Sequence, residues 1–143
     1  MDNHTRPTQL CMHTPYEEIL GYPPDFRVRY RFYTKEEGGR LKIPYQGIRS
    51  DFWYEDPSHK PNQIFIIWPE FEDENGNVIL ENDKSVPSEG IARMWIIIPE
   101  MRSYHRERIK PGTIGFFREG SRSTGVCEVI ELLGLTTNPT SKK

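Results

Sequence analysis

The segment 26–32 constrains the fold most strongly, because its side chains alternate between apolar and basic. Phe26, Val28, Tyr30 and Phe32 occupy the even positions, and arginines occupy the odd ones. Successive side chains of a β-strand point to opposite faces, whereas a helix repeats every 3.6 residues and would scatter these four around its surface. The pattern predicts a strand over residues 26–34, with one buried face and one basic, hydrated face.

Other segments have the composition of short strands, and turn signals separate them. Asn75-Gly76 predicts a hairpin with a type I′ turn, because both central residues of that turn need a positive φ. The further strands are expected at 52–54, 63–71, 78–80, 91–98, 113–118 and 125–133. Six or seven short strands without a long helical period predict an all-β sandwich or small barrel. Closure is favoured because it removes exposed strand edges.

The chain length of 143 residues fits one domain with short extensions. The first 25 residues hold four of the twelve prolines and little apolar periodicity, which predicts a largely irregular N-terminal arm. One helical turn is expected at 16–20, and four apolar side chains of the arm are candidates to cover a flank of the domain. These are Tyr16, Ile19, Leu20 and Tyr22. The domain is expected to span 26–134, and 135–143 to form a C-terminal tail.

Composition excludes several classes of protein. A net charge of −2 argues against a generally basic nucleic-acid binder of the histone kind. No apolar run approaches the roughly 20 residues that span a bilayer, and the first residues lack the apolar core of a signal peptide. Two distant cysteines, Cys11 and Cys127, do not make a disulfide framework. We therefore expect a cytoplasmic protein without a membrane anchor.

Two loop motifs carry a resemblance to a known family. Residues 34–40 read Thr-Lys-Glu-Glu-Gly-Gly-Arg and precede Pro44, Gly47, Arg49 and Phe52. Residues 117–122 read Phe-Arg-Glu-Gly-Ser-Arg and precede Gly125 and a hydrophobic strand, with Val86-Pro87 and the strand 91–98 in between. Over residues 26–134 this order resembles the C-terminal, third domain of elongation factor Tu. The resemblance implies a six-stranded antiparallel β-barrel.

The resemblance covers that barrel alone. The chain contains no G-x-x-x-x-G-K-[ST] phosphate loop and has no room for a GTPase domain, so we expect no nucleotide binding and no GTP hydrolysis. The chain resembles the third domain as a stand-alone unit with a short N-terminal arm of its own.

The resemblance also implies an RNA-contacting surface, because the family's barrel helps to hold the T stem of aminoacyl-tRNA. The matching positions are Arg40, Arg118, Glu119 and Gly120. Asp51 replaces a neutral glutamine of the family, and a carboxylate facing phosphate would repel it. A further tRNA-facing position of the family falls near His59. The implied function is a non-catalytic binding module linked to translation elongation, with tRNA or a component of the translation machinery as its partner.

A second interpretation is a protein-interaction domain that has lost RNA binding and acts as a decoy or inhibitor. The densest basic cluster comprises Arg102, His105, Arg106, Arg108 and Lys110, and an acidic cluster comprises Glu70, Glu72, Asp73 and Glu74. Two such clusters would polarise the domain and steer an unidentified protein partner. The stripe of Arg27, Arg29 and Arg31 fits either a phosphate track or, better, the hydrated face of an outer strand. The sequence leaves the oligomeric state open.

Candidate catalytic and metal-ligating residues do not form a convincing site. His4, Cys11 and His13 match no zinc spacing, and no fourth ligand accompanies them. Ser121, Ser123 and Thr124 lack a nucleophile elbow, and the adjacent Glu36 and Glu37 belong to a turn. We expect no enzymatic activity, no metal site and no cofactor.

Overall fold

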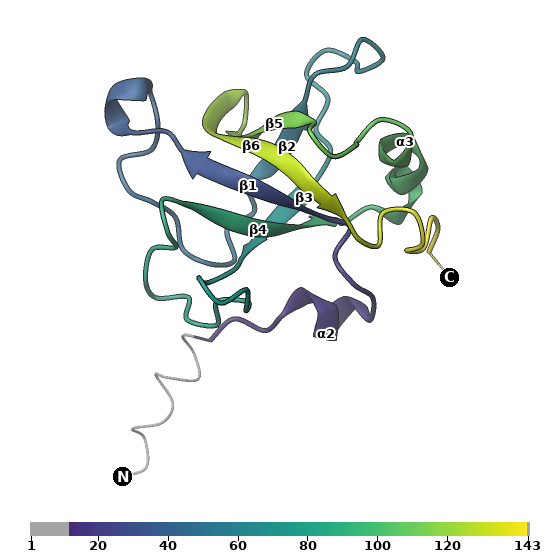
Figure 1. Ribbon diagram of the computed structural model, residues 1–143. Coiled ribbons are helices and arrows are strands. Elements are labelled where there is room, and N and C mark those ends of the chain that lie inside the picture. The colour runs from purple at the N-terminus through teal and green to yellow at the C-terminus, as the bar shows by residue number, and fades with distance from the viewer. Residues whose placement is uncertain (1–11, 143) are drawn as a thin grey trace.

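In the computed structural model, which describes residues 12–142, six antiparallel strands form one sheet that curls into a half-barrel (Figure 1). The strands follow the order β2-β5-β6-β1-β4-β3 across the sheet. Their bounds are β1 Phe26–Phe32, β2 Asp51–Tyr54, β3 Ile67–Phe71, β4 Glu89–Ile96, β5 Ile114–Glu119 and β6 Arg122–Leu132. The helical segments are α2 Tyr16–Leu20, α3 Arg102–Arg106 and two 3₁₀ turns at Lys35–Glu37 and Pro99–Met101. The all-β, six-stranded antiparallel prediction is confirmed.

Strand β1 follows its sequence pattern. Phe26, Val28, Tyr30 and Phe32 are buried, and β1 pairs with β4 on one side and β6 on the other. Its arginines lie on the outer face and each is paired: Arg27 with Glu72 and Glu131, Arg29 with Glu128, and Arg31 with Glu37. The stripe of arginines is therefore the charged outer face of a strand, as the interpretation of a hydrated face predicted.

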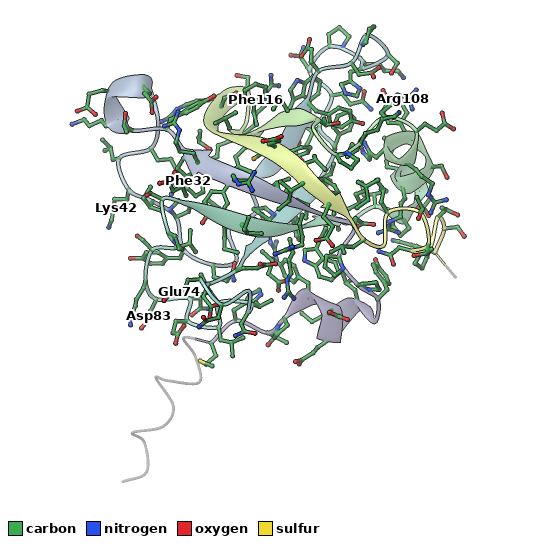
Figure 2. All side chains as sticks on the ribbon, in the orientation of Figure 1. Phe32, Lys42, Glu74, Asp83, Arg108 and Phe116 are labelled. Atoms are coloured by element: carbon green, nitrogen blue, oxygen red, sulfur yellow. The ribbon has the colours of Figure 1, made fainter. Side chains whose placement is uncertain are left out.

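The concave side of the sheet holds an aromatic core, which includes Phe32 (Figure 2). Tyr30, Phe32, Phe71 and Phe117 lie with ring centroids 5.1–6.1 Å apart, at edge-to-face or tilted angles that favour aromatic pairs. Gly115 lets β2 approach β5, because a Cβ there would lie 2.3 Å from the Phe52 ring. The core therefore depends on a bulky ring facing a residue without a side chain.

The hairpin after β3 differs from its prediction. Residues 78–80 form no strand: one bridge pairs Glu72 with Val78, and it is flanked by backbone hydrogen bonds from Asp73 N–H to the Asn77 carbonyl and from Ile79 N–H to the Phe71 carbonyl, at 2.7 and 3.0 Å. Gly76 has a φ of 82°, whereas Asn75 does not adopt a positive φ, so the turn is not type I′. The Asp73 carboxylate instead accepts the backbone N–H groups of Asn75 and Asn77, at 2.8 and 3.0 Å. The Asp73 side chain therefore stabilises the turn by binding backbone N–H groups of that turn, and a second left-handed residue is not needed.

The described part of the arm packs on the outer face of β4. Trp95 is fully buried there, and the rings of Tyr16 and Tyr22 lie against it at 5.9 and 6.3 Å. The buried Glu70 carboxylate ties the arm down, because it accepts from the Trp95 indole, the Tyr16 backbone N–H and His13. The predicted helical turn at 16–20 and its covering role are thus confirmed for the tyrosines.

Ile19, by contrast, is 63% exposed and covers nothing. Residues 1–11 of the predicted arm lie outside the described residues.

Both ends of the domain meet at a buried ion pair. Asp25 and Arg102 are fully buried, with Asp25 Oδ1 2.6 Å from Arg102 Nε. Asn138 joins them by donating to Asp25 and to the Pro23 carbonyl, and Leu135 is fully buried nearby. The segment 135–138 therefore packs on the sheet, although the sequence pattern placed it in a tail. None of the described helices is long and apolar enough to cross a membrane.

Candidate binding groove

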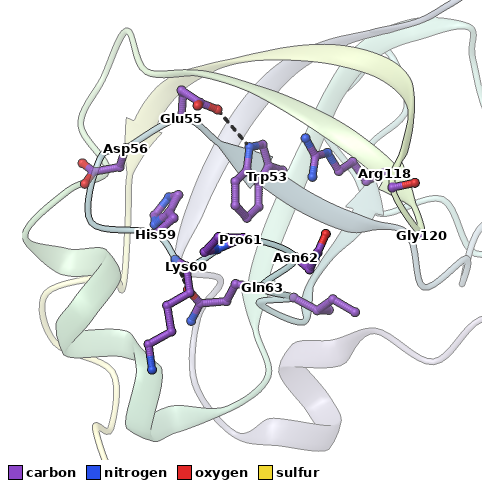
Figure 3. Close-up of a pocket in the computed structure, with 12 residues that line it drawn as sticks. Trp53, Glu55, Asp56, His59, Lys60, Pro61, Asn62, Gln63, Arg118 and Gly120 are labelled. Carbon is purple, nitrogen blue, oxygen red and sulfur yellow. Dashed lines mark hydrogen bonds between the residues drawn. The ribbon is translucent and has the colours of Figure 1, made fainter.

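A groove of about 590 Å³ lies between the loop 55–64 and the β5–β6 hairpin (Figure 3). The loop forms one wall, strand β2 supplies the floor through Trp53, and the hairpin forms the other wall. The lining residues are Trp53, Glu55, Asp56, His59, Lys60, Pro61, Asn62, Gln63, Ile64, Arg118, Gly120 and Ser121.

Trp53 organises the groove. It alternates with the inward-facing Phe52 and Tyr54, so it points to the outer side of β2. Phe65 stacks parallel to one face of the indole at 5.3 Å, and the Arg118 guanidinium lies 4.5 Å from the ring centroid. The indole N–H donates to Glu55 at 3.2 Å (Figure 3). The ring is therefore immobilised, and it supports the guanidinium by a cation–π contact.

Arg118 is the main cation of the groove. Its Nε is buried and has no hydrogen-bond partner among the described residues. The nearby carboxylates are already engaged, since Glu55 accepts from Trp53 and Asp56 accepts from Ser58. Buried N–H groups without partners are rare in folded proteins, because each costs the desolvation of a donor. A buried Nε cannot be reached from outside, so an external acceptor would meet this guanidinium at its Nη groups, which make no hydrogen bond within residues 12–142; an anionic oxygen suits them best.

Asp51 pairs with Arg118 across strands β2 and β5. The sequence predicted that it faces RNA, but in the structure it has a structural role. Its carboxylate accepts the backbone N–H groups of Phe65 and Ile67, at 3.1 and 3.0 Å. These two bonds span the gap between β2 and β3, the edge strands of the curled sheet. Burial raises the pKa of the Asp51 carboxyl, while the backbone N–H groups act in the opposite direction. Asp51 therefore closes the half-barrel with a side chain instead of a strand ladder.

The loop wall is held in an unusual backbone conformation. Asn62 and Ile66 have φ values of 62° and 55°, and a positive φ is a genuine outlier for a β-branched residue such as isoleucine. The Ile66 carbonyl accepts the N–H of Ile97 at 3.1 Å, so β4 and Asp51 anchor the end of the loop on both sides. Such strain persists only where the surrounding structure imposes it.

The remaining residues from the resemblance divide between two sides of the hairpin. Gly120 lines the groove, with a φ of 66°. Glu119 instead forms an ion pair with Arg40, and Arg122 donates to the carbonyls of Gly38 and Gly39. The motifs at 34–40 and 117–122 thus lie side by side, and they brace each other outside the groove.

The predicted basic surface patch is corrected by the structure. Arg102 and His105 are fully buried, so they do not contribute to a surface. Arg106 donates to the carbonyls of Leu135 and Asn138, which leaves only Arg108 and Lys110 beside α3.

The predicted acidic cluster is also broken up. Glu70 and Glu72 are buried, and Glu72 is bound by Arg27 and Arg93. Counting charged residues in one segment of the sequence therefore overestimates the charge at the surface when those residues have partners far along the chain.

Sequence reasoning missed the aromatic support behind the loop wall. Tyr54, His59, Phe65, Tyr104 and His105 pack together with ring centroids 4.6–6.1 Å apart. Burial lowers the pKa of His105 to about 3 and also lowers the pKa of His59, so both rings are neutral at pH 7. The signal in the sequence was the density of aromatic residues and histidines in 52–65 and 104–105.

A metal centre is not formed by the described residues, where no three His, Cys, Asp or Glu side chains cluster in a suitable way. His4 and Cys11 lie outside those residues. Comparison with models of protein families finds no match, and comparison with curated proteins finds none either.

Proposed function

We propose that this chain is a non-catalytic binding module of the kind represented by the third domain of elongation factor Tu, and that its groove takes the phosphate backbone of a tRNA. The single observation that carries the proposal is the Arg118 guanidinium, held over Trp53 at the groove with no N–H group bonded to another of residues 12–142. A planar guanidinium donates several N–H groups in a fixed fork, which suits phosphate oxygens.

Other features of the groove bear on this ligand class. Lys60 adds a second cation, which together with Arg118 balances the Glu55 and Asp56 carboxylates, and the left-handed Gly120 brings the hairpin backbone to the rim without a side chain. Trp53 is only 9% exposed, with Phe65 and Arg118 against its ring, so it offers little surface for stacking a base. Contacts in this groove therefore favour the backbone of RNA over its bases.

The Asp51 carboxylate opposes an RNA ligand less than its place in the sequence implies. Repulsion of phosphate was one argument for lost RNA binding, but the oxygens of this carboxylate accept two backbone N–H groups of residues 65 and 67. The protein-interaction alternative drew in part on the clusters at 102–110 and 70–74, most of whose charges are buried or paired. These two findings favour the RNA interpretation.

The test is binding of fluorescein-labelled deacylated tRNA, followed by anisotropy at several salt concentrations. Arg118→Ala is expected to weaken binding roughly 10- to 150-fold, the range for losing one charged hydrogen bond. It should also reduce the slope of log affinity against log salt by about one, because one phosphate contact is lost. Arg118→Lys keeps the charge but loses the fork, and should restore only part of the affinity.

The matched control is Arg29→Ala, which removes the same charge from the exposed outer face of β1. Equal effects of Arg118→Ala and Arg29→Ala would show that net charge, and not the groove, governs binding. If the unaltered protein does not bind tRNA at low salt, the proposal is wrong and a protein ligand becomes the better hypothesis.

A further inference from the structure

A chain of hydrogen bonds links the loop wall of the groove to α3. Asp56 Oδ1 lies 2.5 Å from Ser58 Oγ, which lies 2.9 Å from the Tyr104 hydroxyl, which lies 2.7 Å from His59 Nδ1. Three of the four residues belong to the loop 55–64, and Tyr104 is the member from α3. The hydroxyl of Tyr104 is therefore the contact through which α3 holds both Ser58 and His59.

Counting the available protons shows which group donates and which accepts at each step of this series of hydrogen bonds. Hydrogen bonds from Ser58 lower the pKa of Asp56, so this carboxylate is ionised and only accepts. Ser58 has one hydroxyl proton, and the short contact with Asp56 uses it. Tyr104 must then donate to Ser58 Oγ, which leaves its own oxygen to accept from His59. His59 therefore carries its proton on Nδ1.

Two further observations agree with that direction. His59 Nε2 is buried without a partner among the described residues, which costs less for a bare acceptor than for an N–H group. Arg108 Nε donates to Ser58 Oγ at 2.9 Å and fills the second acceptor position of that oxygen. The Arg108 guanidinium also lies 3.7 Å from the centroid of the Tyr104 ring, and its Nη1 donates to the Tyr104 carbonyl at 2.6 Å. Arg108 therefore restrains the ring of Tyr104, while Ser58 and His59 restrain its hydroxyl.

We propose that Tyr104 is a positioning residue for the groove, which sets the ring orientation and tautomer of His59 and thereby the position of the wall opposite Arg118. His59 packs edge-on against Trp53 at 4.9 Å, so the ring that Tyr104 holds in turn supports the ring beneath Arg118. This inference rests on the proposed function, because the wall matters only if the groove binds a ligand. It assigns two residues to the support of the site: Tyr104 of α3, and Arg108, which lies beside α3 at the edge of the molecule (Figure 2).

The test is Tyr104→Phe, which removes the hydroxyl and keeps the ring under Arg108. In the unaltered protein, ¹⁵N NMR of labelled histidine is expected to show His59 protonated at Nδ1. In Tyr104→Phe, Nδ1 loses its acceptor, so the preference for the Nδ1-protonated tautomer should weaken, and affinity for labelled deacylated tRNA should fall about five- to tenfold, as for one ordinary hydrogen bond. Ser58→Ala interrupts the same chain without an aromatic change and should weaken binding in the same direction.

Tyr45→Phe is the matched control, since Tyr45 is 43% exposed in the loop 40–48, its hydroxyl makes no hydrogen bond within residues 12–142, and it does not line the groove. It should change neither the tautomer nor the affinity. An Nε2-protonated His59 in the unaltered protein would overturn the direction of the chain and with it the proposal. Unchanged tRNA affinity in a folded Tyr104→Phe protein would overturn the positioning role alone, whereas absence of binding by the unaltered protein would overturn the proposed function as well.

Discussion

Replacing Arg102 with alanine is the most severe test of how the two ends of the chain hold the fold. The Arg102 side chain is fully buried, and its Nε lies 2.6 Å from Asp25 Oδ1. Its Nη2 donates to the Ile96 carbonyl at 2.8 Å, and its Nη1 donates to the Pro139 carbonyl. The variant leaves the Asp25 carboxylate buried without a countercharge.

The magnitude follows from that uncompensated charge. Removing one partner of a buried ion pair costs about 3–5 kcal/mol, and the free energy of unfolding of a domain is about 5–15 kcal/mol. Arg102→Ala should therefore lose a large fraction of the stability and lower Tm by roughly 6–20 °C. Urea titration with tryptophan fluorescence measures the loss.

A second substitution makes the reasoning refutable. Asp25→Asn should destabilise the unaltered protein, because it breaks the same pair. In the Arg102→Ala background it should instead be neutral or stabilising, because it removes the stranded charge. The explanation fails if Arg102→Ala costs less than about 1 kcal/mol, or if Asp25→Asn costs the same in both backgrounds. Arg29→Ala, at an exposed pair 3.8 Å apart, should change stability by less than about 0.5 kcal/mol.

Two further substitutions test the closure of the half-barrel. Asp51→Asn leaves one of the two N–H groups at 65 and 67 without an acceptor and should cost about 1–3 kcal/mol in urea titration, without a gain in tRNA affinity. Because the pKa of Asp51 is raised in the folded state, its contribution to stability should fall as pH rises above about 3.9, and the variant should lack that slope. Gly115→Ala would place a Cβ 2.3 Å from Phe52 Cζ and 2.8 Å from the Trp53 carbonyl, so β2 must shift; we expect a loss of about 3 kcal/mol or more. Gly90→Ala, whose Cβ would have no neighbour nearer than 3.5 Å, should cost less than about 1 kcal/mol, and equal losses at both glycines would contradict the steric argument.

The sheet could be predicted from the sequence because its signals are local. The alternation in 26–32 depends only on neighbouring residues, and the buried face of β1 follows from it directly. The expected strand at 78–80 failed for the same reason. Val78, Ile79 and Leu80 are apolar and follow a turn signal, but the Leu80 carbonyl and Glu81 pair with His13 and Met12 of the arm instead of extending the hairpin, and nothing local to the sequence records that partner.

The partners of charged residues could not be predicted, because they lie far along the chain. Arg102 stands in a basic run that reads as a hydrated loop, yet its partner Asp25 precedes it by 77 positions. Glu70 reads as part of an acidic surface, yet it binds His13 from the arm, 57 positions away. Burial of a charge depends on finding such a partner. The motifs marked Arg118 and Gly120 as candidate binding residues, and both line the groove. The supporting roles of Trp53 and Tyr104 depend on three-dimensional packing and could not be read from the sequence.

The overall charge of −2 does not rule out an anionic ligand in the groove, because charge acts locally in solution. Potentials of exposed charges are screened within about 8 Å at physiological ionic strength. The outer arginines of β1 are neutralised by Glu72, which follows β3, by carboxylates of β6 and by Glu37. The carboxylates at the groove are engaged by Trp53, Ser58 and Arg108. The cations that remain for a ligand there are Arg118 and Lys60. The fixed geometry of the Arg118 guanidinium therefore contributes more to ligand selection than long-range attraction to the whole protein does.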